Sequence, residues 1–247
     1  MKNYRCYMDI LAINKNNLKC SSNYKDLKID PLLDKISSVE LIRVSGSDLD
    51  VVNAARVSYG KVSDKLTEKD VKLINFLMRH RHTSPFEHNQ LSFRIKCPIF
   101  VARQWMRHRM NSYNEISYRY VESELEFYIP NEWRYQDKIN HQASYGAFLS
   151  EEALETYKKG LEQSRESYLN LLKMGVCREQ ARAVLPVTTY TEFIFTCNLH
   201  SFIHFLDLRM SKGAQWEIQK YAEAMYELAL PYFKASLEAW NRLRQEK

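Results

Sequence analysis

The sequence has 247 residues, of which 45% are apolar, and a formal net charge of +6. This length and composition predict a globular protein of one domain, or at most two, and exclude wholesale disorder. With only 6 glycines and 6 prolines, the chain favours long helices over a sandwich or barrel of many short strands. The positive charge suits an acidic partner, and nucleic acid, membrane surfaces and phosphorylated small molecules all fit it.

The cysteines and the hydropathy pattern indicate the compartment. The five cysteines form no C-x-x-C pair, which excludes common zinc-ribbon spacings and argues against a disulfide framework. They are Cys6, Cys20, Cys97, Cys177 and Cys197. The sequence contains neither a signal-peptide core nor an apolar run long enough to span a bilayer. We therefore expect a cytoplasmic protein that contacts no membrane.

The first 36 residues differ from the rest of the chain. Polar patches at residues 14–17 and 21–23 interrupt any helical or strand period. We interpret residues 1–36 as an N-terminal appendage of unknown role, with one strand and a loop. Residues 37–247 then form the main domain.

The first regular elements of the main domain are a strand and two helices. The β-branched run from Val39 to Val44 indicates the strand. Asp48 is a candidate N-cap for a helix that ends near Gly60. Thr67 and Asp70 have the spacing of a capping box and begin the next helix.

A second strand and a helix follow. The segment Gln90–Lys96 alternates strictly between apolar and polar side chains, which predicts a half-buried antiparallel strand. Pro98 precedes a helix that is expected over residues 99–108. Residues 111–114 look like a loop, and residues 118–129 are expected to return to the sheet.

The C-terminal half is predicted to be mostly helical. Ser150 caps a long helix that is followed by Gly175, and a short helix comes next. We expect one helix over residues 191–210 and a last one from Trp216 that is interrupted at Pro231. Together these elements predict an α+β fold: a single domain with one antiparallel or mixed sheet surrounded by long helices.

The segment from Arg107 to Tyr120 carries the most chemical information. Within 14 residues it has three arginines, a histidine, a glutamate, two asparagines and two serines. Arg103 lies one turn earlier on the same helical face. Arginine forks match phosphate oxygens, whereas asparagine, glutamate and serine supply the donors and acceptors that the edge of a heterocycle needs. A solvated helix end would favour lysine and glutamate instead.

The same segment resembles the signature of the flavin-dependent thymidylate synthases, in which nine positions are specified and all nine are present here. They are Arg107, His108, Arg109, Ser112, Asn114, Glu115, Ser117, Arg119 and Tyr120. The resemblance extends to Thr83–His88, Ala102–Trp105, Phe127–Pro130, Ala181–Arg182, Leu185–Pro186, Leu206–Arg209 and Gln215–Glu217. It implies that residues 37–247 are a catalytic domain with the fold of that family.

This resemblance implies an enzyme that methylates dUMP to dTMP. In that family the one-carbon unit comes from 5,10-methylenetetrahydrofolate, and the electrons come from NADPH through FAD, without a protein nucleophile. Activation of the uracil then depends on donors aimed at the charge that develops on the ring. The resemblance also implies a homotetramer whose sites are shared between subunits.

The matching positions imply roles for individual residues, with Arg209 as the catalytic residue at the pyrimidine edge. The dUMP site is expected to contain Gln104, Arg107, Glu115, Ser117, Arg119, Arg182 and Arg209. The FAD site is expected to contain Ser84, Arg107, His108, Arg109, Glu115, Asn198, His200 and His204, with His82 near the flavin. No metal is implied. Three residues depart from many relatives, since His200 replaces an arginine, His204 an asparagine and Gly213 a histidine.

Two other functions fit part of the sequence. His200 and His204 lie four residues apart with Asp207 a turn beyond, a spacing that suits the metal of a hydrolase. The basic balance, with 16 Tyr and 11 Phe, permits nucleic-acid binding. However, the arginines of the signature are interleaved with Asn114 and Glu115 instead of lining a stripe, so we expect no nucleic-acid partner.

Two side chains could be mistaken for nucleophiles. Cys197 is expected in the middle of a helix, where a buried thiol packs as a small hydrophobic group. Ser117 has no histidine–acid pair at a spacing that predicts activation, so we interpret it as a hydrogen-bonding ligand for the nucleotide.

Overall fold

The computed structural model describes residues 28–120, 124–140 and 143–246, and its centre is a five-stranded sheet. The strands are β1 (Lys28–Ile29), β2 (Ser38–Ser45), β3 (Gln90–Pro98), β4 (Ser112–Glu115), β5 (Trp133–Gln136), β6 (Ser144–Phe148) and β7 (Tyr190–Asn198). The sheet has the order β1-β2-β3-β7-β4 with antiparallel neighbours, and β5 and β6 form a separate antiparallel ribbon. The predicted α+β class with an antiparallel sheet is confirmed.

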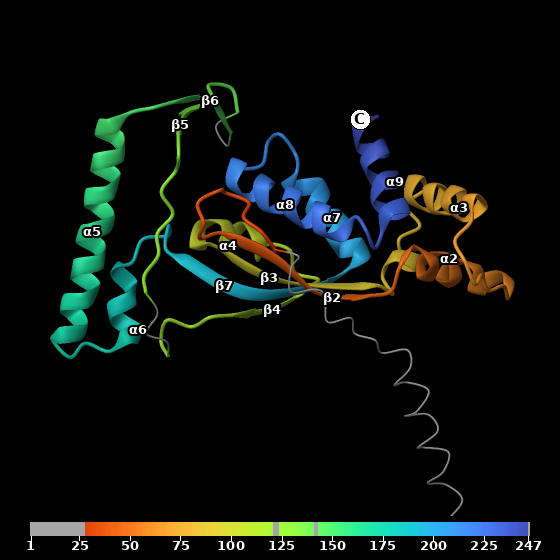
Figure 1. Ribbon diagram of the computed structural model, residues 1–247, viewed down its shortest axis with the longest axis horizontal. Helices are drawn as coiled ribbons and strands as arrows, with labels where there is room; N and C mark the ends of the chain where they lie inside the picture. The colour runs from red at the N-terminus through yellow and green to blue at the C-terminus, as the bar shows by residue number, and fades with distance from the viewer. Residues whose placement is uncertain (1–27, 121–123, 141–142, 247) are drawn as a thin grey trace, which may run out of the picture.

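Helices cover the sheet and extend from both of its ends (Figure 1). The helices are α2 (Asp48–Arg56), α3 (Glu68–Arg79), α4 (Ile99–Trp105), α5 (Glu151–Lys173), α6 (Arg178–Ala181), α7 (Leu199–Arg209), α8 (Trp216–Ala229) and α9 (Lys234–Gln245). Short 3-10 turns add η2 (Val57–Tyr59), η3 (Ser84–Phe86) and η4 (Arg182–Val184). Helices α4, α7 and α8 lie on one face of the sheet, α2, α3 and α9 gather at one end, and α5 and α6 stand at the other.

The two central strands each run directly into a helix. β3 pairs with β7 along its whole length, from Gln90 opposite Asn198 to Pro98 opposite Tyr190. β3 continues into α4, and β7 continues into α7. The predicted alternation of β3 is confirmed, because Leu91 and every second residue after it are buried against the helices.

The prediction of one helix over residues 191–210 is wrong. This segment contains most of β7, which ends at Asn198, and then α7. Phe193, Phe195 and Cys197 are buried while their neighbours are partly exposed, which is the period of two of a strand. The Asn198 side chain accepts a hydrogen bond from the Ser201 amide at 2.8 Å and so caps the start of α7.

Three further boundaries differ from the predictions. The expected loop at residues 111–114 is mostly strand β4, which pairs with β7. In the expected strand at residues 118–129, Tyr118–Tyr120 form a turn, and the described part of this segment pairs with the sheet only through an isolated bridge between Phe127 and Thr189. α4 ends at Trp105 instead of His108, because the Trp105 carbonyl accepts from the His108 amide and the Tyr113 hydroxyl.

Most predicted helix ends are confirmed, but Asp48 is not an N-cap. Ser47 holds that position, and the Asp48 carboxylate instead contacts the first turn of α9. Asp70 accepts from the Thr67 amide at 2.8 Å, and Ser150 accepts from the Ala153 amide at 3.1 Å. Other confirmed features are Gly60 and Gly175 in the left-handed region after their helices and the break between α8 and α9.

The core lies between the sheet and the helices of its covered face. The Trp105 ring at the end of α4 is fully buried. Its centroid lies 4.9 Å from that of Phe205 on α7, 5.4 Å from Phe193 on β7 and 5.8 Å from Tyr221 on α8. This aromatic cluster joins three helices and the sheet, so it fixes the positions of the C-terminal ends of α4 and α7.

Part of the predicted N-terminal appendage packs with the domain. β1 pairs with β2, and Leu32 is buried in the core. Residues 1–27 lie outside the described residues. Among the described helices, none combines the length and the hydropathy needed to cross a membrane.

Candidate active site

The Arg209 guanidinium is held by two acceptors at the C-terminal ends of α4 and α7. Arg209 is the last residue of α7, and its Nε donates to Nε2 of His108 at 3.0 Å. Its Nη2 donates to the carbonyl oxygen of Gln104 at 2.9 Å. That carbonyl belongs to the last turn of α4, where backbone oxygens lack partners within the helix and cations are favoured.

The local electrostatics keep His108 neutral. Burial, followed by the charge of Arg209 and the neighbouring His204, lowers the pKa of His108 to about 4. The neutral ring therefore presents an unprotonated Nε2 that accepts from Arg209. Burial and the nearby Arg107 lower the pKa of Arg209, but an arginine remains charged at neutral pH. The result is a half-buried cation fixed by two neutral acceptors.

Two cavities share a wall made by α7. The smaller has a volume of about 360 Å³ and is lined by Arg107, His108, Arg109, Met110, Asn111, His200, Ser201, His204, Leu208 and Arg209. The larger has a volume of about 560 Å³, and its lining includes His82, Thr83, Phe86, His200, Ile203, His204, Trp240 and Arg244. His200 and His204 line both cavities, so they lie at the boundary between them.

These cavities fit the chemistry of a flavin nucleotide. Their volumes lie in the range of about 300 to 1,000 Å³ that is common for small-molecule sites. Arg107 and Arg109 offer planar donor forks that suit a diphosphate, and both are exposed on the wall of the smaller cavity. The apolar side chains of the larger cavity, such as Phe86 and Ile203, suit a ring system. Five of the expected flavin residues line the smaller cavity, and His82 lines the larger.

Three expected flavin residues, Ser84, Glu115 and Asn198, line neither cavity in the described structure. Ser84 begins η3, is exposed, and uses its carbonyl to accept from the Glu87 amide. Asn198 caps α7 through its side chain. Asn198 therefore has a structural role in addition to any contact with a cofactor.

The remaining expected substrate residues lie apart from the Arg209 cluster. The Glu115 carboxylate accepts from the Thr191 hydroxyl at 2.6 Å. Arg119 lies near Glu179, with 3.9 Å between Nη1 and Oε2, and Arg182 is exposed at the start of η4 just after α6. The described chain thus brings Gln104 into contact with Arg209 and Arg107 close to Arg209. Glu115, Ser117, Arg119 and Arg182 line neither cavity, and neither does Gln104.

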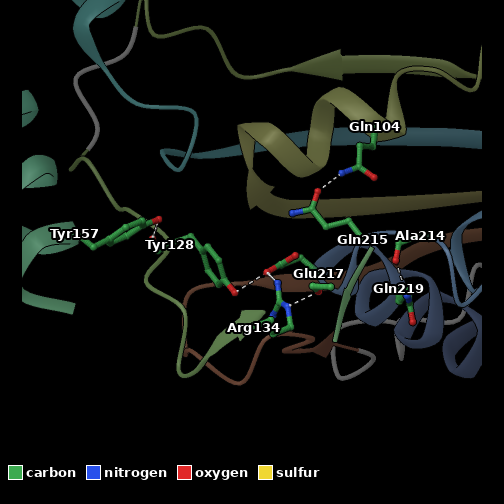
Figure 2. Close-up of polar contacts among 9 residues, drawn as sticks. Gln104, Tyr128, Arg134, Tyr157, Ala214, Gln215, Glu217 and Gln219 are labelled. Atoms are coloured by element: carbon green, nitrogen blue, oxygen red, sulfur yellow. Dashed lines mark hydrogen bonds and ion pairs between the residues drawn. The ribbon is translucent and has the colours of Figure 1, made fainter. Parts of the chain in front are cut away.

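Sequence reasoning assigns no role to two side chains that contact site residues. The Oε1 atom of Gln215 accepts from Nε2 of Gln104 (Figure 2). Gln215 is part of a segment that matches the family, but the match does not indicate its partner. The contact between Thr191 and Glu115 was missed because residues 191–210 were predicted as a helix. A strand at this position pairs with β4 and places Thr191 beside Glu115.

The alternative chemistries find little support in the geometry. Among the described residues, no group of three or more His, Cys, Asp or Glu side chains is arranged to hold a metal ion. Cys197 lies on β7 instead of in a helix, and it is buried. Burial raises the pKa of its thiol far above the usual range, so the thiol is not a ready nucleophile.

Comparisons with known proteins agree on one family. The family model described as "Thymidylate synthase complementing protein" matches residues 40–233. A flavin-dependent thymidylate synthase from Thermus thermophilus is 52% identical over 198 residues, which cover 80% of this chain and 73% of the relative. One from Thermosipho melanesiensis is 48% identical over 194 residues, which cover 77% and 84%.

A solved structure supports the same relationship. The UMP/dUMP methylase PolB from Streptomyces cacaoi, bound with 5-Br dUMP, superimposes with a TM-score of 0.76 at 37% identity. The match covers 83% of this chain and 95% of PolB. Together with the complete signature and the cationic cavities, these similarities show that the chain belongs to the flavin-dependent thymidylate synthase family.

Proposed function

We propose that this protein converts dUMP to dTMP, with bound FAD as the redox cofactor, 5,10-methylenetetrahydrofolate as carbon donor and NADPH as reductant. The observation that carries the proposal is the Arg209 guanidinium, fixed by His108 and Gln104 at the wall of a cationic cavity. The names of the relatives and of PolB support the reaction class.

Arg209 suits the activation of a pyrimidine. For C5 to accept a one-carbon unit, electron density and negative charge must build up on the ring. A cation that is already oriented stabilises such charge without a cost of reorganisation, and burial strengthens the effect. Among the described residues, Arg209 uses Nε and Nη2 for its two contacts, so its other donors remain for a ligand. This mechanism needs no thiolate, which agrees with the buried Cys197.

The flavin is proposed to occupy the two cavities along α7. Arg107, Arg109, His200 and His204 would hold it, with His108 and His82 beside them. Ser84, Glu115 and Asn198 complete the proposed set. When bound, FAD supplies the two electrons that reduce the transferred carbon to a methyl group.

The separation of the expected substrate residues supports sites shared between subunits. We propose that Gln104, Arg107 and Arg209 bind dUMP together with Glu115, Ser117, Arg119 and Arg182. Because the last four lie apart from the cavities of their own chain, a homotetramer in which another subunit supplies them explains both sets. The proposed catalytic domain is residues 37–247, and β1 and Leu32 from the proposed appendage pack against it.

The products of the reaction test this proposal. Purified protein is incubated with FAD, NADPH, 5,10-methylenetetrahydrofolate and dUMP, and the nucleotides and folates are separated by chromatography. We expect dTMP together with tetrahydrofolate, and no dTMP when FAD or NADPH is omitted. Formation of dihydrofolate in step with dTMP would indicate the cysteine-dependent reaction and contradict the proposal.

A further inference from the structure

Gln215, the residue just before α8, contacts the proposed active site through its side chain. Figure 2 shows Gln215 pointing toward Gln104, with its Oε1 accepting from Gln104 Nε2. Gln104 is the residue whose carbonyl oxygen holds Arg209. One residue of α4 therefore joins the proposed catalytic arginine to Gln215.

This contact determines which atoms Gln104 offers to a ligand. A glutamine side chain has a carbonyl acceptor and two N–H donors, and it can turn over unless a neighbour selects one orientation. Because Oε1 of Gln215 accepts from Nε2 of Gln104, the side-chain oxygen Oε1 of Gln104 remains for a ligand. A pyrimidine edge is recognised by such a choice of donor and acceptor.

Gln215 is itself held in place by the first turn of α8. The buried Glu217 carboxylate accepts from Arg134 at 2.5 Å and from the Tyr128 hydroxyl at 3.1 Å (Figure 2). The Arg134 guanidinium lies over the Trp216 ring, with its carbon 5.1 Å from the ring centroid. Gln219 donates to the Ala214 carbonyl at 2.6 Å. These contacts fix the backbone on both sides of Gln215.

We propose that Gln215 is a positioning residue that orients the Gln104 amide toward the pyrimidine nucleotide. This inference rests on the proposed function, because Gln104 is assigned to dUMP only there. Gln215 acts through Gln104 and is not placed in contact with substrate. The Gln215–Glu217 segment thereby gains a role in the site. Glu217 and Trp216 hold the start of α8 in place, and Gln215 in turn orients the side chain of Gln104.

Single and double variants of the FAD-loaded protein test the inference by calorimetric titration with dUMP. Gln215→Met removes the acceptor at nearly constant volume and is expected to raise the Kd for dUMP about fivefold, the usual loss for one hydrogen bond. Gln215→Glu keeps an acceptor and is expected to restore the affinity to within about twofold of the wild type. A side chain with a merely structural role would lower the temperature of unfolding without this pattern in the Kd for dUMP.

A double-mutant cycle shows whether Gln215 acts through Gln104. In a Gln104→Met background, Gln215→Met is expected to have no further effect on dUMP affinity, because the acceptor has lost its partner. Additive effects, or unchanged affinity in Gln215→Met while the wild type binds dUMP, would overturn the inference alone. A wild-type protein that binds no dUMP would overturn the proposed function and the inference with it. Thermal unfolding of each variant checks that the fold is retained.

Discussion

Two acceptors with different origins fix the Arg209 guanidinium. The Gln104 carbonyl accepts because it ends a helix, and His108 accepts because burial and nearby cations keep its ring neutral. The sequence identified His108 through the family signature and Arg209 through the flanking match at Leu206–Arg209. It could not identify their contact, because 101 residues separate them and only the packing of α4 against α7 brings them together.

The lowered pKa of His108 predicts a pH-dependent stability. The unfolded ring binds a proton below about pH 6.5, whereas the folded ring does so only near pH 4. The unfolded state therefore binds more protons between these values. The contribution of His108 is complete above pH 6.5 and is lost as the pH falls toward 4.

A variant that cannot titrate isolates this contribution. His108→Gln keeps an acceptor for Arg209, so its free energy of unfolding should fall less than that of the wild type between pH 7 and pH 5. We expect a difference of about 1 kcal/mol, measured by urea unfolding. Equal losses in the two proteins would mean that folding does not lower the pKa of His108.

Cys197 tests the absence of a protein nucleophile. Its thiol is buried on β7, and burial raises its pKa, so we expect Cys197→Ala to lose some stability but keep most of its turnover. The measurement is the rate of dTMP formation beside a thermal unfolding curve. A folded variant without any turnover would require the thiol in the mechanism.

The strand–helix junctions explain which elements could be predicted. β3 was predicted because its alternation is strict and Pro98 marks the change to α4. β7 was missed because it has no such break, and apolar Phe and Ile residues on both faces fit a helix as well as a strand. Asn198 was the available signal, since asparagine is a preferred N-cap. β4 was missed because three of its four residues are polar, and the segment is a strand only through pairing with β7.

Asp48 links two helices that are far apart in the sequence. Its carboxylate accepts from the amides of Ala235 and Ser236 at 2.7 and 3.0 Å, and also from the Ser236 hydroxyl. The carboxylate thus caps α9, whose residues Trp240 and Arg244 line the larger cavity. The cap therefore connects helix stability to the proposed flavin site.

Removal of this cap should destabilise the protein. Asp48→Ala leaves buried donors without a partner, and we expect a loss of about 2 kcal/mol in urea unfolding. Asp48→Asn keeps one acceptor oxygen and should lose less. FAD affinity should weaken in the same order, less for Asp48→Asn than for Asp48→Ala. Equal stability of the Asp48→Ala variant and the wild type would show that solvent caps α9 instead.

The long helix α5 carries apolar side chains that are exposed in the single chain. It stands at one end of the sheet (Figure 1), and Leu169 on α5 and Met174 just after it are exposed. We propose that these side chains take part in a contact between subunits, because apolar patches often mark such contacts. We expect a solution mass of about four times the 29.4 kDa chain, measured by analytical ultracentrifugation, and a smaller mass for Leu169→Glu. A wild-type monomer that forms dTMP would contradict shared sites.

Anaerobic absorption spectroscopy tests flavin binding, flavin reduction by NADPH and methylation of dUMP in one experiment. Protein loaded with FAD is titrated with NADPH, and dUMP and 5,10-methylenetetrahydrofolate are then added while dTMP is measured. We predict that the visible flavin absorbance falls with NADPH and returns only when both later substrates are present, with one dTMP formed for each flavin. Failure to bind FAD, or a return of absorbance without dTMP, would contradict the assignment of this chain as a flavin-dependent dUMP methylase.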